Sequence, residues 1–444
     1  MEHFGMLIIK VLFGLFFIFT LYINISALYS VILTFFGFGK AKRDYELIED
    51  ETRFLILVAA HNEEKVIGST IENLKKIRYQ KDLYDIYVVN DNSTDRTGAI
   101  CDELGMKHID TIEGLYEREG VGKPAGLQYA LRSLGFKELQ NKYDVLMILD
   151  ADNHIDADFL KEMNSQFIGK GRPEAIQAYL DSKNSTTRLS LGYAMSYYLT
   201  NRFFQLAKYR AGLPNAIGGT GFIVRMDYLM KHGGFRFHSL TEDLELEMEI
   251  VKDNGRVLWN HFVRVYDEKP DNLKISIKQR TRWSQGHWWV AFTNLRPMLK
   301  KLFTEKGKIR IVDQILYLFG MARAVQMTIV LVSIIASVGY TILTQNYHNL
   351  PHLGMNFLDL LFGLSIFTLV LFIYQFFGCL WYAISVDTKH KFRPFAMILS
   401  MFYYAYTFIY AQLLGLIKWK QQHTWVKTEH NKTAKLHHNS KENG

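Results

Sequence analysis

The chain has 444 residues, 52 Lys and Arg against 44 Asp and Glu, and a formal net charge of +8. With 49% hydrophobic residues it is not intrinsically disordered. The two cysteines, Cys101 and Cys379, are too few and too far apart for a disulfide-stapled secreted module. The small, dispersed positive excess does not indicate nucleic acid as a partner and is typical of the cytoplasmic face of a membrane protein.

Residues 6–36 form one apolar run whose only charge is Lys10, near its start. About 20 apolar residues span a bilayer, so this run predicts a transmembrane helix. It is too long for a signal peptide, and no small-residue cleavage site follows it. Three basic residues come next and place this flank in the cytoplasm: Lys40, Lys42 and Arg43. We therefore predict an N-terminal transmembrane helix within residues 1–45.

Three further apolar blocks follow residue 310, at roughly 315–344, 356–386 and 394–417. The basic loop 389–393 and the Lys-rich tail from Lys418 are both expected in the cytoplasm. These two assignments conflict if every block crosses the membrane once. Either one block is a hairpin or lies in the interface, or the tail is outside. We expect C-terminal transmembrane helices within 311–418 and a polar tail over 419–444.

The middle of the chain, residues 46–272, alternates short apolar runs with helical stretches. The runs predict buried strands at 53–60, 84–90, 143–150 and 173–180. Helices are predicted at 63–76, 94–104, 121–134 and 156–167. This alternation predicts an α/β domain with a mostly parallel sheet covered on both faces. Ligands in such sheets bind beyond the carboxyl ends of the strands, so the residues that follow each strand matter most.

Polar and acidic residues follow three of these strands, in the segments 61–64, 91–95 and 150–152. Any one of these clusters could be an ordinary turn or helix cap. Their occurrence at successive strand ends favours a shared site. In the sequence Asp-Ala-Asp, the side chains of Asp150 and Asp152 point to the same side of an extended segment. Two such carboxylates make a partial site for Mg²⁺ or Mn²⁺.

Four motifs appear in order: DNSTDRT at 91–97, DAD at 150–152, TED at 241–243 and QRTRW at 279–283. Over about residues 50–300 they resemble the membrane-embedded family 2 glycosyltransferases, a group that includes cellulose, hyaluronan and poly-N-acetylglucosamine synthases. The resemblance implies a GT-A fold (Rossmann-like, nucleotide-diphospho-sugar transferase) flanked by transmembrane α-helices. It also implies inversion of the sugar's anomeric centre, and interfacial helices with the Q-x-x-R-W motif over 273–310.

The resemblance further implies a UDP-sugar donor and assigns residues to it. Asn62 and Glu63 would line the nucleotide pocket and Asp91 would contact the uracil or ribose. Lys123 would face the diphosphate as a point charge, and Asp150 would contact the nucleotide. Asp152 would bind Mg²⁺ or Mn²⁺, which neutralises charge on the leaving UDP.

The resemblance places the catalytic base at Asp243, next to Glu242 in the substrate pocket. Both begin a predicted helical run over 242–251. By residue type alone, this segment could be an acidic helix start that complements the helix dipole. The other three motifs favour catalysis. Glu247, further along the run, is expected on a structural or solvated face.

A second predicted helix, over 275–292, carries Gln279, Arg282 and Trp283 at i, i+3 and i+4, and therefore on one face. An arginine can pair with diphosphate oxygens, and the resemblance places the tryptophan at the acceptor. Trp288 and Trp289 are interpreted as membrane-interface anchors. Within the glycine-rich turn at 218–222, Thr220 is a candidate acceptor contact, although an ordinary tight turn fits equally well.

The favoured function is a processive synthase that elongates a β-linked polysaccharide from cytosolic UDP-glucose or UDP-N-acetylglucosamine and exports it. The alternative is a single transfer onto a membrane lipid. A third hypothesis is a transporter or structural membrane protein with a degenerate domain. The expected partners are the UDP-sugar, a glycan or lipid acceptor and membrane lipids, while an accessory membrane subunit is left open. The expected location is a bacterial plasma membrane with the catalytic domain in the cytoplasm.

Overall fold

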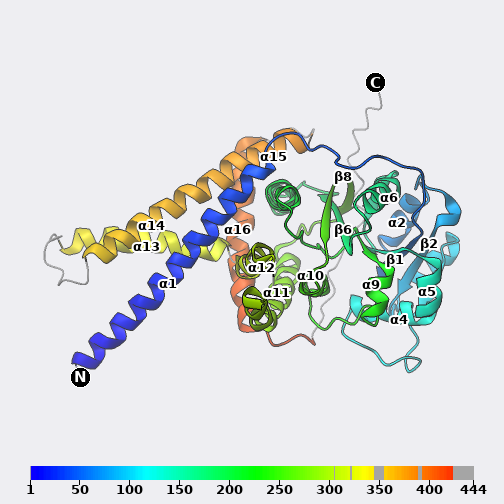
Figure 1. The fold of residues 1–444 in the computed structure, drawn as a ribbon, viewed down its shortest axis with the longest axis horizontal. Helices are drawn as coiled ribbons and strands as arrows, with labels where there is room; N and C mark the ends of the chain where they lie inside the picture. The colour runs from blue at the N-terminus through cyan, green and yellow to red at the C-terminus, as the bar shows by residue number, and fades with distance from the viewer. Residues whose placement is uncertain (1, 305, 321–322, 345–354, 389–392, 424–444) are drawn as a thin grey trace.

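The computed structural model describes residues 2–304, 306–320, 323–344, 355–388 and 393–423. It has two parts, an α/β domain and a set of long apolar helices that project from one side of that domain (Figure 1).

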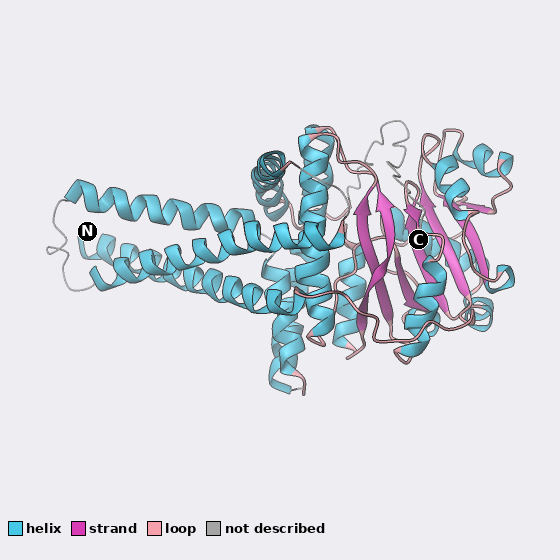
Figure 2. Ribbon diagram, turned by 90° about the horizontal axis from the view of Figure 1, so that it is seen from above, coloured by secondary structure: helices cyan, strands magenta, loops and turns pink. Residues whose placement is uncertain are grey.

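The α/β domain is built on one eight-stranded sheet in the order β3-β2-β1-β4-β7-β6-β8-β5 (Figure 2). Its strands are β1 Phe54–Ala60, β2 Tyr84–Asn90, β3 His108–Asp110, β4 Val145–Asp150, β5 His154–Ile155, β6 Ala175–Ser182, β7 Phe222–Arg225 and β8 Val257–Asp267. The pairs β1–β2, β1–β4, β2–β3 and β6–β8 are parallel. The four predicted strands are present, but the sheet is mixed, because β7 runs antiparallel to both β4 and β6. The chain enters β7 from the glycine turn at the site edge, which reverses its direction.

Helices cover both faces of the sheet, as predicted. On one face lie α2 (Ile67–Leu74), α3 (Thr97–Glu103) and α6 (Phe159–Gly169), packed in one hydrophobic cluster. The other face carries α4 (Lys123–Leu134), α5 (Phe136–Lys142), α9 (Met226–Lys231) and α10 (Glu242–Lys252). Strands such as β1 and β4 are apolar on both sides because both of their faces are buried.

A second group of helices joins this domain to the projecting bundle. It comprises α7 (Arg188–Thr200), the π-helical turn η3 (Asn201–Leu206), α8 (Ala207–Arg210), α11 (Leu273–Thr304) and α12 (Lys308–Gly320). A short 3-10 turn, η2 (Lys81–Leu83), precedes β2. The helix predicted at 275–292 is thus longer than expected. The apolar block 315–344 is divided between α12 and α13 (Arg323–Thr344), which meet at a bend of 72°.

The remaining helices are α1 (Glu2–Thr34) with η1 (Phe35–Gly37), α14 (Met355–Ile373) with η4 (Tyr374–Cys379) and α15 (Leu380–Asp387), and α16 (Pro394–Ile417). By length and composition, three described segments could cross a membrane: Gly14–Gly37, Phe362–Asp387 and Pro394–Ile417. The bent pair α12–α13 could make a fourth. Helices α1, α13 and α14 project together (Figures 1 and 2).

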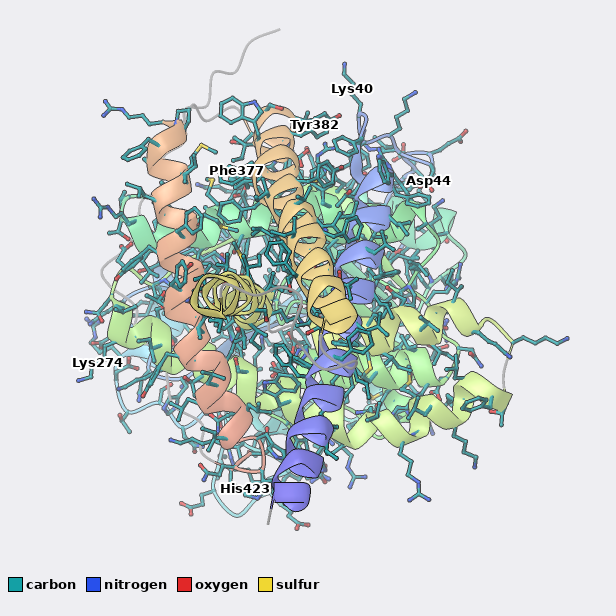
Figure 3. The ribbon with its side chains drawn as sticks, turned by 90° about the vertical axis from the view of Figure 1, so that its left-hand side faces the viewer. Lys40, Asp44, Lys274, Phe377, Tyr382 and His423 are labelled. Atoms are coloured by element: carbon teal, nitrogen blue, oxygen red, sulfur yellow. The ribbon has the colours of Figure 1, made fainter. Side chains whose placement is uncertain are left out.

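Helix α16 follows a different course from the projecting bundle. Figure 3 looks along the bundle and shows α13 end-on, whereas α16 is seen lengthwise. Helix α16 packs along α7 and α11. Two glycines allow this close packing: a Cβ on Gly192 would lie 2.6 Å from the Ser400 carbonyl oxygen, and one on Gly415 would lie 2.3 Å from Ser284 Cβ. This helix therefore lies against the connecting helices α7 and α11.

Candidate active site

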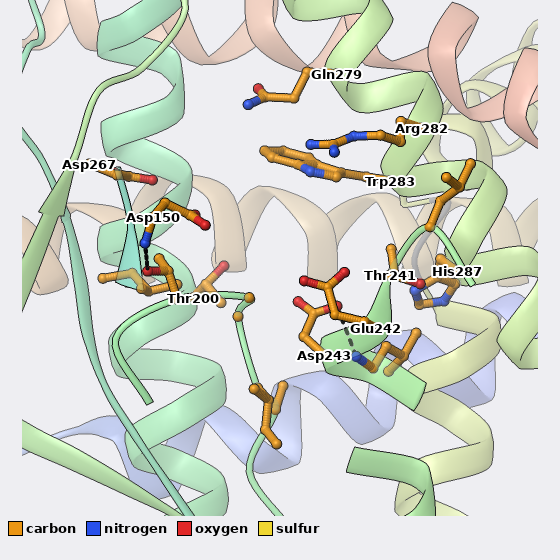
Figure 4. A pocket seen from close by; sticks show the side chains of 18 of the residues that line it. Asp150, Thr200, Thr241, Glu242, Asp243, Asp267, Gln279, Arg282, Trp283 and His287 are labelled. Atoms are coloured by element: carbon orange, nitrogen blue, oxygen red, sulfur yellow. Dashed lines mark hydrogen bonds between the residues drawn. The ribbon is translucent and has the colours of Figure 1, made fainter. Parts of the chain in front are cut away.

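A cavity of about 1110 Å³ lies beyond the carboxyl ends of β1, β2 and β4 and is bounded by α10, α11 and the apolar helices (Figure 4). Eleven of the twelve predicted site residues line it: Glu63, Asp91, Lys123, Asp150, Asp152, Thr220, Glu242, Asp243, Gln279, Arg282 and Trp283. Asn62 does not line it. The Asn62 side-chain oxygen accepts a hydrogen bond from Thr94 N at 2.7 Å, so this side chain braces the loop after β2.

At one end of the cavity, the Asp91 carboxylate is bound by an arginine that the sequence analysis missed. Arg118 donates two hydrogen bonds to it, at 2.8 and 2.7 Å. Thr111 Oγ1 donates a third, at 3.0 Å. Helix α4 can pack against this pair because Gly126 has no side chain: a Cβ there would lie 3.1 Å from Asp91 Cβ. The Asp91–Arg118 pair is thus a bidentate ion pair in the wall at this end of the cavity.

Lys123 lies at the start of α4 and reaches into the middle of the cavity. Its Nζ donates to Asp150 Oδ1 at 2.5 Å and to the Gly219 carbonyl at 2.6 Å, and Glu242 Oε1 lies 3.9 Å away. Burial alone would lower the pKa of Lys123, but the neighbouring carboxylates, Asp150 foremost, raise it above its usual value. A lysine that stays protonated here is suited to bind a diphosphate.

Asp150, Asp152 and Asp267 line the same part of the cavity. Asp152 Oδ2 accepts a hydrogen bond from Glu268 N at 3.0 Å, which orients the carboxylate. Burial raises the pKa of Asp267 to about 6; Lys269 opposes this shift, and the charges of the other two carboxylates add to it. Oxygen ligands of this kind suit Mg²⁺ or Mn²⁺.

Among the described residues, no group of three His, Cys, Asp or Glu side chains is arranged to hold a metal by itself. That arrangement fits an ion held by one or two carboxylates together with substrate phosphates. The oxygen donors of these carboxylates fit the predicted cation, and Asp152 as its ligand stays a prediction.

Two adjacent acids, Glu242 and Asp243, enter the cavity from the first turn of α10. Figure 4 shows them on one side of the cavity, with Gln279, Arg282 and Trp283 from α11 on the other. Burial, and then the Glu242 charge, raises the pKa of Asp243 to about 7. A carboxylate with such a pKa can accept a proton near neutral pH.

The backbone passes close to Asp243 at Gly219. This residue has φ +79°, and a Cβ on it would lie 3.2 Å from Asp243 Oδ2. Glycine is the residue that adopts this left-handed conformation without strain. The turn at 218–222 therefore borders the Asp243 carboxylate, and Thr220 as an acceptor contact stays a prediction. The Thr220 hydroxyl is buried and accepts a hydrogen bond from Asp150 N at 3.1 Å.

Helix α11 places Gln279, Arg282 and Trp283 along the cavity, as their spacing predicts. Burial lowers the pKa of Arg282 below its usual value, and the negative charges of Glu242, Asp150 and Asp243 oppose this shift. Trp283 packs edge-on against Tyr193, with ring centroids 6.3 Å apart. The Trp283 ring is thereby held as one wall of the cavity.

Two other predictions on these helices can be compared with the structure. Glu247 is fully buried, so the structural interpretation applies and the solvated one does not. Trp288 is not a membrane-interface anchor: it is buried in a cluster with Leu244 and Met248 of α10. Helix α11 therefore packs on the helix that carries Asp243.

Sequence reasoning missed three further residues of the cavity: Arg118, Asp267 and Tyr197. Asp267 ends β8, and an acidic residue after a strand was an available signal that the sequence analysis did not use. Arg118 and Tyr197 had none, because they lie in a loop and in the middle of a helix without a motif around them.

A mixed α/β sheet with acidic strand ends beside an Arg-Trp helix fits a glycosyltransferase with a GT-A fold. Residues 52–286 match the model of "Glycosyltransferase like family 2". The chain therefore belongs to this glycosyltransferase family, which confirms the predicted resemblance and excludes the transporter hypothesis.

Several curated proteins are similar to this chain. "Probable glycosyltransferase YdaM" of Bacillus subtilis is 28% identical over 86% of this chain and 88% of that protein. The beta-monoglucosyldiacylglycerol synthase of Synechocystis is 28% identical over 52% of this chain and 47% of its own length. The poly-beta-1,6-N-acetyl-D-glucosamine synthase of Staphylococcus aureus is 24% identical over 52% and 53%. The chain thus spans about half the length of these last two proteins.

Among solved structures, the mannosyltransferase PcManGT from Pyrobaculum calidifontis, in complex with GDP-Man and Mn²⁺, has a similar fold. The TM-score is 0.53 at 14% identity, and the match covers 81% of this chain and 98% of that chain. This likeness concerns the fold.

Proposed function

We propose that this protein is an inverting, divalent-metal-dependent transferase that moves a sugar from a cytosolic UDP-sugar to an acceptor hydroxyl. The observation that carries the proposal is the single cavity that holds Lys123, Asp152 and Asp243 together. Lys123 supplies a positive charge for the diphosphate, Asp152 a carboxylate for the metal, and Asp243 a base for the proton of the acceptor. UDP-glucose and UDP-N-acetylglucosamine are the two donors we favour.

In this proposal, Asp91 with Arg118 borders the nucleotide, and Lys123 and Arg282 face the diphosphate. Asp152 would hold Mg²⁺ or Mn²⁺, which neutralises charge on the leaving UDP when bound. Asp243 takes the proton from the acceptor hydroxyl, whose oxygen attacks the anomeric carbon from the face opposite UDP. Inversion follows from this single displacement.

Two classes of acceptor fit the cavity. The first is the end of a β-linked polysaccharide, extended processively and exported through the apolar helices. Trp283 supports it, because an aromatic ring across the cavity from Asp243 can hold the apolar face of a terminal sugar. The second is a membrane lipid. The part of the cavity lined by α1, α12 and α13 supports this class, because an acceptor can then enter from the bilayer.

We also propose that the protein resides in a bacterial plasma membrane with its α/β domain in the cytoplasm. The basic residues Lys40, Lys42 and Arg43, which follow the apolar part of α1, support this orientation.

The test incubates membranes that contain the full chain with radiolabelled UDP-sugars and Mg²⁺ or Mn²⁺, followed by product sizing. We expect transfer from one donor, and its loss on chelation of the metal. A high-mass product supports polymer synthesis, and an organic-extractable product with one or two sugars supports lipid glycosylation. Absence of transfer from every common UDP-sugar would overturn the proposed activity.

A further inference from the structure

The cavity also has a membrane end, to which the proposed reaction assigns no residue. There its walls come from α1, α12 and α13, and they include Ser26, Ser30, Leu316, Gly320 and Arg323. Ser26 and Ser30 belong to the segment Gly14–Gly37, which is apolar enough to cross a membrane. A charged residue within such a wall calls for a functional explanation.

Arg323 is the first residue of α13, and its side chain is exposed to the cavity. Its Nη2 donates to Ser30 Oγ at 2.6 Å. Within the described part of the chain, no carboxylate lies within 4.0 Å of its guanidinium. By contrast, the buried Lys208 nearby is paired with Asp313 at 2.8 Å. Arg323 thus has a neutral partner and no internal counter-ion among these residues.

The depth of Arg323 within the apolar segment indicates what kind of group it binds. Ser30 lies seven residues before Gly37, which is about 10 Å inside the end of the apolar segment at 1.5 Å per residue. A guanidinium remains charged at that depth, and an anion is its natural partner. Its fork of donors matches phosphate oxygens in particular.

We propose that Arg323 binds the phosphate of a membrane lipid and that this lipid carries the acceptor hydroxyl. The lipid enters between α1 and α13, its phosphate pairs with Arg323 beside Ser30, and its headgroup extends along the cavity toward Asp243. This inference rests on the proposed transferase activity and names its acceptor class, a phosphate-bearing lipid. Diacylglycerol lacks the group that Arg323 would bind.

The test measures lipid binding to the purified full chain by native mass spectrometry, with phosphatidylglycerol and diacylglycerol as probes. We expect preferential retention of phosphatidylglycerol. In Arg323→Gln this retention should fall about 10- to 100-fold, the loss expected for a charge-assisted hydrogen bond of about 1.5–3 kcal/mol. Arg323→Lys should keep part of it. Arg393→Gln, an exposed arginine that does not line the cavity, is the control and should bind as the unchanged protein does.

A second arm separates the sources of phosphate. Inorganic phosphate should fail to displace phosphatidylglycerol if the lipid is the ligand, and efficient displacement would overturn the lipid assignment. Equal lipid binding by Arg323→Gln and the unchanged protein would overturn the inference as a whole. UDP binding is measured in parallel: its retention in Arg323→Gln shows an intact donor site, whereas absence of UDP binding in the unchanged protein contradicts the proposed function instead.

Discussion

Asp243 lies beside a second buried carboxylate, Glu242, and opposite the backbone of Gly219. Burial, and then the charge of Glu242, favours the protonated form, so the pKa of Asp243 rises to about 7. The motif predicted the position of this residue at the helix start. The sequence could not predict the close approach of Gly219, because the two residues meet only through the fold.

The first prediction concerns a single residue, in the substitution Asp243→Asn. Asparagine keeps the size of the side chain but cannot accept the proton, so turnover should fall by about 10²- to 10⁴-fold. Donor binding should change little, and the measurement is the initial rate of sugar transfer beside UDP binding. Glu249→Gln, which removes a carboxylate from the same helix outside the cavity, serves as the control. Full activity of Asp243→Asn would remove this residue from the mechanism.

The second prediction is the pH dependence of transfer. The base works when deprotonated, and burial places the pKa of Asp243 at about 7. The rate at saturating donor should therefore rise with pH, reach half its maximum near pH 7 and level off above it. A half-maximum near pH 4, the value of an exposed aspartate, would show that Asp243 is not held in a buried, charged environment.

Among the elements, α11 and α10 fix the two sides of the site relative to each other. A Cβ on Gly286 would lie 2.6 Å from the backbone N of Thr241, so α11 touches the residue that precedes the two acids. The spacing of Gln279, Arg282 and Trp283 was predictable because it follows from helix periodicity. The contact between Gly286 and Thr241 was not, because it depends on how two distant helices cross.

We predict that Gly286→Ala separates these helices. An added methyl group would overlap Thr241, and overpacking of this kind costs about 1–3 kcal/mol. Turnover and the melting temperature in detergent should both fall. Gly363→Ala tests the same substitution in α14, where no atom of the described residues lies within 4 Å of the new methyl group, and it should leave both unchanged. Unaltered turnover in Gly286→Ala would mean that the helix crossing does not position Asp243.

Helix α10 is also anchored one turn beyond Asp243. Glu247 accepts hydrogen bonds from Gln314 of α12 at 2.8 Å and from Ile217 N at 3.1 Å. Burial raises the pKa of Glu247 from its ordinary 4.5 to about 8, while Lys208 opposes the shift. The folded protein thus holds a proton that the unfolded chain releases above pH 4.5.

We therefore predict that the protonated Glu247 side chain contributes to the stability of the fold. This contribution is fully present below about pH 4.5 and is lost as the pH rises through about 8. Glu247→Gln cannot titrate, so its melting temperature should fall less between pH 5 and pH 9 than that of the unchanged protein. It should also be lower at pH 5, since Gln loses one of the two hydrogen bonds. Parallel melting curves for the two proteins would contradict a raised pKa at Glu247.

For the whole molecule, the direction of α16 bears on the topology that the sequence left open. Before α16, Asp387 pairs with Arg202 and lies 3.2 Å from His261 of β8. After it, Gln422 accepts a hydrogen bond from Leu240 N at 2.8 Å. Both flanks therefore touch the α/β domain. Apolar composition alone predicts a crossing helix for α16, because the sequence does not distinguish lipid from a protein surface as its partner.

We predict that both ends of α16 lie on the cytoplasmic side. Single cysteines introduced as Arg393→Cys and Lys418→Cys, both at exposed positions, should react with an impermeant thiol reagent in inside-out vesicles but not in intact cells. The native Cys101 and Cys379 are buried and provide the background. Labelling of Lys418→Cys from outside intact cells would show that α16 crosses the membrane.

Helix α16 also contributes Met401, Tyr404 and Phe408 to the walls of the reaction cavity. A soluble fragment that ends before α16 would keep every acidic motif and still lack one side of its own active site. Truncation to the α/β domain, a common route to crystals and inhibitor screens, would thus yield a domain with an opened cavity and a displaced α11. Any inhibitor search against this enzyme should begin with the intact, lipid-embedded chain.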